Sequence, residues 1–295
     1  MNSEHGADEG WGAHPEIPRP WSDAALRIAD LAASRVFVFG PTDVGKSTFC
    51  GLLLKAMCDT RQEASLLDAD LGQKMIGPPA CVTLGNALPE GVIGLSGLAF
   101  VGTTDPLRGW RGLINGIRRL STKVSSGPLV INTGGLVHGP GLRLKAEKVK
   151  ALEPDLLVLI GEVRALEPDW ISHTQVIELP PSPHARRKPE GQRRAARRHA
   201  FRSYFQNSKE TLFDLSKVAL GSPDDSDLLL RNRLLIGLSD DAGEDLGLGI
   251  VTAFDAQART VTCLTPIDVS AVVQLRWGNL LLGEDFSENT LAVAL

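Results

Sequence analysis

Several familiar signals are scarce or absent in this chain of 295 residues. Its cysteines (Cys50, Cys58, Cys81 and Cys263) include no C-x-x-C pair, so neither a zinc site nor a disulfide framework is indicated. No apolar run reaches the length of a membrane span. The net charge of -4 gives no global signal for nucleic acid, so any such signal has to be local. We therefore expect reduced thiols and a cytoplasmic location.

The N-terminal segment also lacks the basic-then-apolar order of a secretory signal peptide. It contains Glu4, Asp8 and Glu9 among several glycines and prolines, a composition typical of a poorly ordered tail. The expected organisation is an N-terminal tail and lead-in at 1–30, a main domain at 31–230 and a small β-rich C-terminal module at 231–295.

Short apolar runs alternate with helical patterns through most of the main domain. Buried strands are predicted at 31–39, 65–70, 92–101, 129–132, 155–160 and 176–179. Helices are predicted at 46–58, 107–123 and 142–152. This alternation implies an α/β fold with right-handed βαβ units around a parallel sheet flanked by helices. The β-like runs of the C-terminal module are 234–238, 249–254, 260–264, 271–275 and 280–282.

A complete phosphate-loop motif follows the first predicted strand. The segment Gly40-Pro41-Thr42-Asp43-Val44-Gly45-Lys46-Ser47-Thr48 contains G-x-x-x-x-G-K-[ST] between a strand and a helix. Backbone N–H groups of such a loop face inward as an anion nest, and the helix N-terminus adds partial positive charge. Lys46 is predicted to reach the β- and γ-phosphates of ATP, and Ser47 to ligate Mg²⁺. The fold is therefore of the P-loop NTPase type, although the loop alone does not name a reaction.

Two carboxylates lie at the end of the second predicted strand. Asp68 and Asp70 point to the same side of an extended chain. One could hold Mg²⁺ while the other accepts a proton from an attacking hydroxyl; the alternative is a pair of solvated turn acids. A second acid that faces an acceptor suits phosphate transfer to a hydroxyl better than hydrolysis alone.

A basic segment follows a Pro-rich loop. Residues 184–205 hold eight Arg or Lys side chains and one acid. Arg194, Arg198 and Arg202 share one face of a helix, where like charges repel unless an anion lies among them. The segment could be a lid that neutralises a transferring phosphoryl group, a grip on a nucleic-acid backbone, or a solvated basic surface. We predict Arg194 and Arg198 as the catalytic arginines, whereas Arg202 fits a structural role equally well.

The order of these motifs resembles that of the polynucleotide 5′-hydroxyl kinase family of RNA processing, which includes the kinases of mRNA 3′-end cleavage and ribosomal RNA maturation. The phosphate loop and the Asp-x-Asp-x-Gly-Gln segment that ends at Gln73 are typical of that family. Three more segments are similar to it: the Pro-containing acceptor loop at 78–84, the Asn-Thr-x-Gly segment at 132–139 and the Arg-x-Tyr-Phe end at 202–205.

The resemblance implies an enzyme that uses ATP and Mg²⁺ to phosphorylate the 5′-hydroxyl end of RNA or DNA. Asp70 falls at the position of the family's catalytic base, and Asp68 would support the metal or the base. The metal ligands implied are Ser47, Asp68 and Asp70. The acceptor-binding residues implied are Gln73, Thr133, Gly135 and Leu136.

The chain departs from the family pattern in two places. Leu136 replaces an aromatic residue that can stack on the acceptor's terminal base, and such stacking contributes about 1–3 kcal/mol per base. Trp110 could line the acceptor groove instead, or pack in the core. Moreover, about thirty residues precede the first predicted strand, too few for the separate N-terminal β domain of the eukaryotic members, so a partner-binding role of that domain is not implied.

Two other functions fit part of the pattern. The lost aromatic at Leu136 favours an ATP-binding scaffold that transfers no phosphate. A GTPase or metallochaperone-type NTPase would need a guanine-reading Asn/Thr-Lys-x-Asp motif, which the sequence lacks. On the predicted helix at 142–152, Lys145, Lys148 and Lys150 are expected to form a solvated face.

Overall fold

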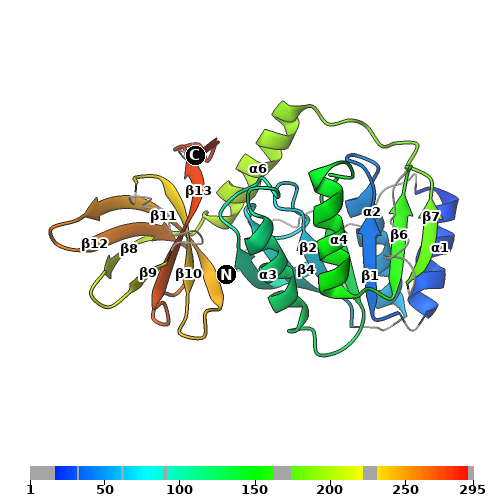
Figure 1. Cartoon of the computed structure of the whole chain (residues 1–295), viewed down its shortest axis with the longest axis horizontal. Coiled ribbons are helices and arrows are strands. Elements are labelled where there is room, and N and C mark those ends of the chain that lie inside the picture. Colours follow the sequence, from blue (N-terminus) through cyan, green and yellow to red (C-terminus); the bar gives the residue numbers. More distant parts are fainter. Residues whose placement is uncertain are drawn as a thin grey trace, which may run out of the picture. The chain divides into compact units, whose positions relative to one another are not determined.

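The computed structural model describes residues 17–31, 33–60, 63–88, 92–162, 174–221 and 231–291. Within these ranges the chain forms five helices and two sheets (Figure 1). The helices are α1 (Arg19–Asp30), α2 (Lys46–Asp59), α3 (Trp110–Ser121), α4 (Pro140–Leu152) and α6 (Glu190–Tyr204). None of the helices in this part of the chain is both long and apolar enough to cross a membrane.

The first sheet carries the phosphate loop and has the strand order β4-β3-β2-β5-β1-β6-β7. Its strands are β1 (Arg35–Phe39), β2 (Ser65–Ala69), β3 (Cys81–Ala87), β4 (Ile93–Phe100), β5 (Leu129–Thr133), β6 (Leu156–Ile160) and β7 (Gln175–Leu179). The pairs β1–β5, β1–β6 and β6–β7 are parallel. All residues of β2, β5 and β6 are buried, and accordingly β6 is entirely apolar while β2 and β5 are apolar except for a few buried polar side chains.

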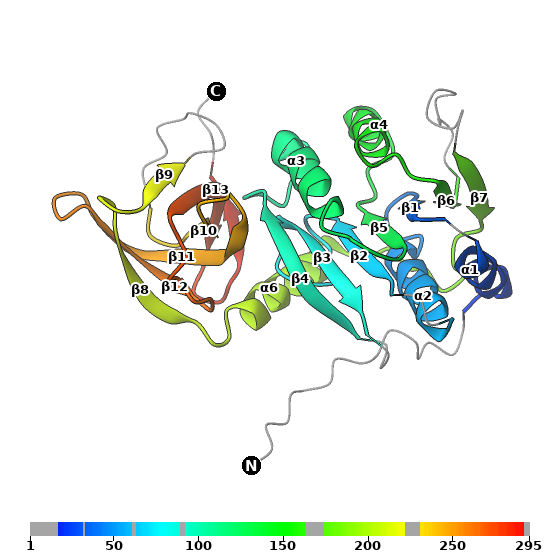
Figure 2. The ribbon, with the colours of Figure 1, turned by 90° about the horizontal axis from the view of Figure 1, so that it is seen from below.

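Helices cover both faces of the first sheet. Figure 2 shows α4 on one face and α1 and α2 on the other, as right-handed crossovers in opposite directions along the sheet require. Helix α1 was not predicted, because residues 1–30 were expected to be a tail. Its buried residues Trp21, Ala25 and Ile28 recur at helical spacing and pack the helix against α2. Residues 1–16 lie outside the described residues.

The second sheet confirms the predicted β-rich C-terminal module. Its strand order is β14-β13-β10-β11-β12-β8, and β9 pairs with β13 in parallel. The strands are β8 (Lys209–Asp214), β9 (Ala219–Gly221), β10 (Leu234–Ser239), β11 (Asp245–Asp255), β12 (Thr260–Thr265), β13 (Gln274–Leu282) and β14 (Glu288–Thr290). Since β8 and β9 precede residue 231, the sheet begins earlier in the chain than the expected module.

Two other local predictions were wrong. The segment at 78–84, expected as an acceptor loop, becomes strand β3 from Cys81 onward. The runs at 271–275 and 280–282 were expected to be separate strands, but β13 is continuous over Gln274–Leu282 because its alternate residues are buried.

The chain packs into two compact units that are discontinuous in sequence. The first comprises Met1–Asp68, Leu84–Ser96 and Ser121–Arg187, and the second comprises Ala69–Thr83, Gly97–Leu120 and Lys188–Leu295. The phosphate loop, α2 and α4 therefore belong to the first unit. Asp70, α3, α6 and the second sheet belong to the second unit.

A buried carboxylate joins four elements of the second unit. Asp245 is 8% exposed and accepts hydrogen bonds from the backbone N–H of Phe100 on β4 at 2.9 Å and from Ser239 Oγ on β10 at 3.0 Å. It also forms ion pairs with Arg119 on α3 and Arg276 on β13. Because each carboxylate oxygen has charged and neutral donors, Asp245 is a fully hydrogen-bonded charge rather than an isolated one.

Replacing this carboxylate should destabilise the second unit. We expect Asp245→Asn to lower the free energy of unfolding by about 3 kcal/mol, since Arg119 and Arg276 then lose the buried negative charge that both of them contact. Urea-induced unfolding measures the change. The exposed Asp241→Asn is the matched control and should stay within about 0.5 kcal/mol of the wild type. Equal stabilities of the two variants would contradict the assignment.

Candidate active site

The phosphate loop is supported from behind by an aromatic side chain. Gly45 has a backbone φ of +99°, and a Cβ there would lie 2.5 Å from the ring of Trp21. Trp21 is completely buried, donates through Nε1 to the carbonyl of Pro180 at 2.9 Å and packs edge-on against Phe49. The ring thus fixes the turn that begins α2, and any side chain at Gly45 would displace it.

The polar side chains of the loop suit a bound nucleotide. Lys46 Nζ lies over the loop and donates to the carbonyl of Pro41 at 2.5 Å. Ser47 and Thr48 are exposed in the first turn of α2, where N–H groups have no partner within the helix. A cation, hydroxyls and helix-terminal amides at one place fit phosphate oxygens and a Mg²⁺ ion bound to them.

Asp68 is buried in the core of the first unit. Its exposed fraction is zero, and its Oδ1 accepts a hydrogen bond from Asn132 Nδ2 on β5 at 3.1 Å. Burial, with the negative charge of Asp68 as the second cause, raises the pKa of the Cys50 thiol on α2. The alternative of two solvated turn acids is therefore wrong for Asp68. This residue lies on β2, and its side chain is close to β5 and to the phosphate-loop helix α2.

The described residues contain no group of three or more His, Cys, Asp or Glu side chains that could hold a metal ion.

The Asn-Thr-x-Gly segment is held by a buried lysine. Thr133 Oγ1 donates to the carbonyl of Val38 on β1 at 2.8 Å, and Lys145 Nζ on α4 donates to Thr133 Oγ1 and to the carbonyl of Gly134, each at 2.5 Å. The expected solvated face of α4 is thus wrong at two positions. Lys145 and Lys148 are 3% and 2% exposed, whereas Lys150 is exposed.

The same segment lies directly against the phosphate loop. A Cβ on Gly135 would be 2.2 Å from Thr42 Oγ1 and 2.5 Å from the Thr42 backbone nitrogen. Only glycine permits this approach. The next residue, Leu136, is 43% exposed, so the position at which the family has an aromatic residue presents an apolar side chain to the surface.

In the second unit, Asp70 begins a tight turn. Its Oδ1 accepts hydrogen bonds from the N–H groups of Gly72 at 2.9 Å and Gln73 at 3.0 Å. This Asx turn fixes the orientation of the carboxylate after the end of β2. The side chain is half-buried.

Helix α6 lies along this turn. Gln73 Nε2 donates to the carbonyl of Arg193 at 3.3 Å, and the Cδ atom of Arg197 is 3.9 Å from the place where a Cβ of Gly72 would be. Arg197 is 11% exposed and pairs with Glu288 at 2.5 Å. Arg194 and Arg197 both pair with Glu190 at 3.3 Å, but Arg194 is far more exposed, at 71%.

The predicted lid arginines therefore lie on the solvent-facing side of α6. Arg198 pairs with Asp285 at 3.1 Å and is 45% exposed. Nothing in these contacts tests whether Arg194 or Arg198 acts in catalysis, which stays a prediction. The contacts do show that the backbone carbonyl of Arg193 and the side chain of Arg197, neither of which the sequence analysis selected, lie against the Asp70 turn.

The C-terminal end of α6 is anchored in the second unit. Phe201 and Phe205 are buried in a cluster with residues of the second sheet, and Tyr204 Oη accepts a hydrogen bond from the N–H of Leu248 at 2.9 Å. Burial raises the pKa of the Tyr204 hydroxyl, which therefore stays neutral. The Arg-x-Tyr-Phe segment is thus a hydrophobic anchor for the basic helix.

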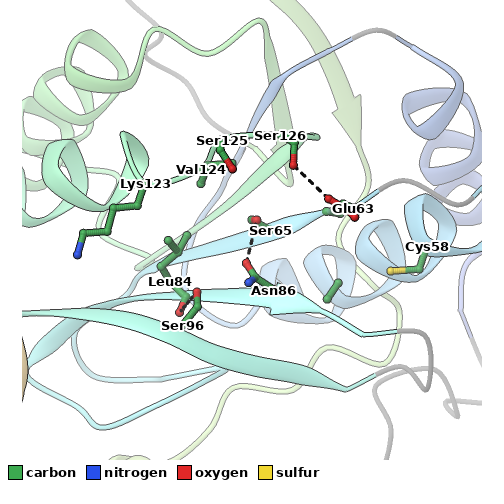
Figure 3. A pocket seen from close by; sticks show the side chains of 12 residues that line it. Cys58, Glu63, Ser65, Leu84, Asn86, Ser96, Lys123, Val124, Ser125 and Ser126 are labelled. Carbon is green, nitrogen blue, oxygen red and sulfur yellow. Dashed lines mark hydrogen bonds between the residues drawn. The ribbon is translucent and has the colours of Figure 1, made fainter.

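A cavity of about 760 Å³ in the first unit is lined by no residue of the phosphate loop, of the Asp70 turn or of the Asn-Thr-x-Gly segment. It lies beside the first residue of β2 and the end of β3 (Figure 3). Among its lining residues, the Ser65 hydroxyl donates a hydrogen bond to Asn86 and the Ser126 hydroxyl donates one to Glu63. The phosphate loop, in contrast, follows the last residue of β1. We assign this cavity no part in nucleotide binding.

Comparison with known proteins defines the family. A family model described as the P-loop of mRNA cleavage and polyadenylation factor CLP1 matches residues 40–207, more than half of the chain, so the chain belongs to that family. A polyribonucleotide 5′-hydroxyl-kinase of Pyrococcus furiosus is 27% identical, with 92% of this chain and 95% of the relative aligned. That of Thermococcus kodakarensis is 28% identical over 86% of this chain and 89% of its own.

More distant comparisons agree. The polyribonucleotide 5′-hydroxyl-kinase Clp1 of Danio rerio is 26% identical, covering 79% of this chain and 67% of its own. A solved structure of Clp1p in complex with Pcf11p superimposes with a TM-score of 0.66 at 12% identity, covering 89% of this chain and 78% of that chain. At that identity the structural likeness shows the fold, and it confirms the predicted P-loop type.

The close approach of Gly135 to Thr42 makes a direct prediction. We expect Gly135→Ala to weaken ATP binding by about ten-fold or more, because the added methyl group overlaps loop backbone that cannot move aside. Titration with a fluorescent ATP analogue measures the dissociation constant. Gly191→Ala, where a Cβ meets nothing within 4 Å, is the control and should bind as the wild type does. Undiminished binding by Gly135→Ala would contradict the packing.

Proposed function

We propose that this chain is an ATP-dependent kinase that transfers the γ-phosphate of ATP to the 5′-hydroxyl end of RNA or DNA. The observation that carries the proposal is the Asp70 carboxylate, held by two backbone amides at the end of the strand whose Asp68 packs beside the phosphate-loop helix. An NTPase that only hydrolyses needs no second acid fixed in this way. The relatives named polyribonucleotide 5′-hydroxyl-kinases add support.

In the proposed reaction, the 5′-hydroxyl oxygen attacks the γ-phosphorus as its proton passes to Asp70, and ADP leaves. The phosphate-loop amides and Lys46 stabilise the β- and γ-phosphates. Mg²⁺, held by Ser47 with Asp68 and Asp70, would neutralise phosphate charge when bound. Thr133, Gly135, Leu136 and Gln73 are the proposed acceptor contacts.

Lid arginines complete the proposal. Positive charge near the transferring group stabilises the charge spread over its equatorial oxygens. Arg194 and Arg198 remain candidates, but we favour Arg197 because it faces the Asp70 turn and is the least exposed of the three. We also propose a cytoplasmic location, with which the free thiols of Cys50, Cys58, Cys81 and Cys263 agree.

The deciding experiment is label transfer from γ-labelled ATP to matched RNA and DNA oligonucleotides that carry a 5′-hydroxyl. A 5′-phosphorylated oligonucleotide is the blank. Transfer to either acceptor supports the kinase. The absence of transfer to every acceptor, together with intact ATP binding, would instead support the ATP-binding scaffold that the surface leucine at Leu136 favours.

Asp70→Asn separates proton transfer from folding. The amide keeps the oxygen that accepts the N–H groups of Gly72 and Gln73, so the turn should survive. We expect kcat to fall by about 10²–10⁴-fold while the ATP dissociation constant changes little. Asp59→Asn, at the exposed end of α2, is the control. A fully active Asp70→Asn variant would remove Asp70 from the reaction.

Arg197→Ala tests the choice of lid arginine. We expect kcat to fall by about 10²-fold or more, and by less in Arg194→Ala and Arg198→Ala. Glu288→Gln is the matched control, because it breaks the same ion pair and keeps the guanidinium. If Glu288→Gln lost as much activity as Arg197→Ala, Arg197 would act only by anchoring α6.

A further inference from the structure

Two lysines of α4 are almost completely buried, which is unusual for a side chain that carries a charge. Lys145 and Lys148 lie three residues apart on the face of α4 that packs against the first sheet. Lys145 and Lys148 belong to neither the phosphate-loop motif nor the Asn-Thr-x-Gly motif. Their burial therefore needs a separate explanation.

The contacts of Lys145 point to the phosphate loop. Its ammonium donates to Thr133 Oγ1 and to the carbonyl of Gly134, and it lies 5.3 Å from the centre of the Phe39 ring. Phe39 is the last residue of β1 and directly precedes the loop. Thr133 Oγ1 in turn donates a hydrogen bond to the carbonyl of Val38, so one hydroxyl joins the lysine to β1.

These contacts form a continuous path to the loop backbone. Lys145 holds Thr133 and Gly134, and the next residue, Gly135, touches the backbone of Thr42. On the outer side, Leu136 packs against α4, where a Cβ on Gly141 would lie 2.6 Å from the Leu136 Cβ. The segment 133–136 is therefore fixed to α4 at both ends and meets the phosphate loop in between.

We propose that Lys145 is a positioning residue for phosphate transfer: its buried ammonium holds the segment 133–135 against Thr42 and so fixes the phosphate loop relative to the acceptor side. The role in transfer rests on the proposed kinase function. Lys148 lies on the same buried face and provides the comparison for Lys145.

Methionine substitutions separate this role from packing. Lys145→Met keeps the length of the apolar stem and removes the donors. We expect the amides of 133–137 to exchange hydrogen about ten- to a hundred-fold faster in Lys145→Met, because hydrogen bonds to a charged group are lost. Lys148→Met, equally buried, and the exposed Lys150→Met should leave this exchange unchanged.

Kinetics provide the second readout. We expect kcat of Lys145→Met to fall by about ten-fold or more, while the dissociation constant of ATP changes by less than about three-fold. Unchanged exchange in 133–137, an equal rise in Lys148→Met, or a kcat within about two-fold of wild type would each overturn the proposal. If the wild type transfers no phosphate, the kinase function fails, and the exchange comparison alone decides whether Lys145 holds the segment.

Discussion

A phosphate loop works only if its backbone amides stay turned toward the anion, and the loop has few side chains with which to hold that shape. The support therefore has to come from behind. Here it is supplied by the ring of Trp21 beneath Gly45 and by the Gly135 backbone against Thr42. Each contact depends on a glycine, Gly45 in the loop itself and Gly135 in the segment that meets Thr42, and neither position has room for a Cβ atom. The N-terminal helix, the residue that follows β7 and the Asn-Thr-x-Gly segment thus all help to hold the shape of the phosphate loop.

In the second unit, the basic helix α6 is likewise held by contacts from other elements. A helix with many arginines and few apolar residues has no broad apolar face that could pack against a core along its first three turns. Phe201, Tyr204 and Phe205 hold its far end, and ion pairs with Asp285 and Glu288 hold its middle. The arginines therefore lie on a helix that is fixed at its C-terminal end. The strand β14 also contributes, because its Glu288 pairs with Arg197.

Much of this could be predicted from the sequence, because the strongest signals are local. The phosphate loop, the buried strands and the acidic turn each depend on residues that are close together in the chain, and their elements are confirmed. Helix α1 also had a readable signal, in the spacing of Trp21, Ala25 and Ile28, but its acidic and proline-rich surroundings obscured it. The burial of Lys145 had no such signal, since a lysine on a helix is ordinarily at the surface. Likewise, Arg197 and Arg194 differ only in which side of α6 faces the Asp70 turn, and this depends on distant contacts.

The continuity between α6 and the second sheet has a practical consequence for protein engineering. The sheet begins at Lys209, five residues after α6 ends, and its buried side chains enclose the end of that helix. Asp245 in turn ties the sheet to α3 and β4. A shortened version of the chain that stops before the sheet would therefore expose the aromatic residues at the end of α6 and remove Asp245 and Glu244, the two ion-pair partners of Arg119. The part of the sequence that looks most like a removable appendix is therefore one that a shortened version of this chain must retain to keep α6 and α3 packed.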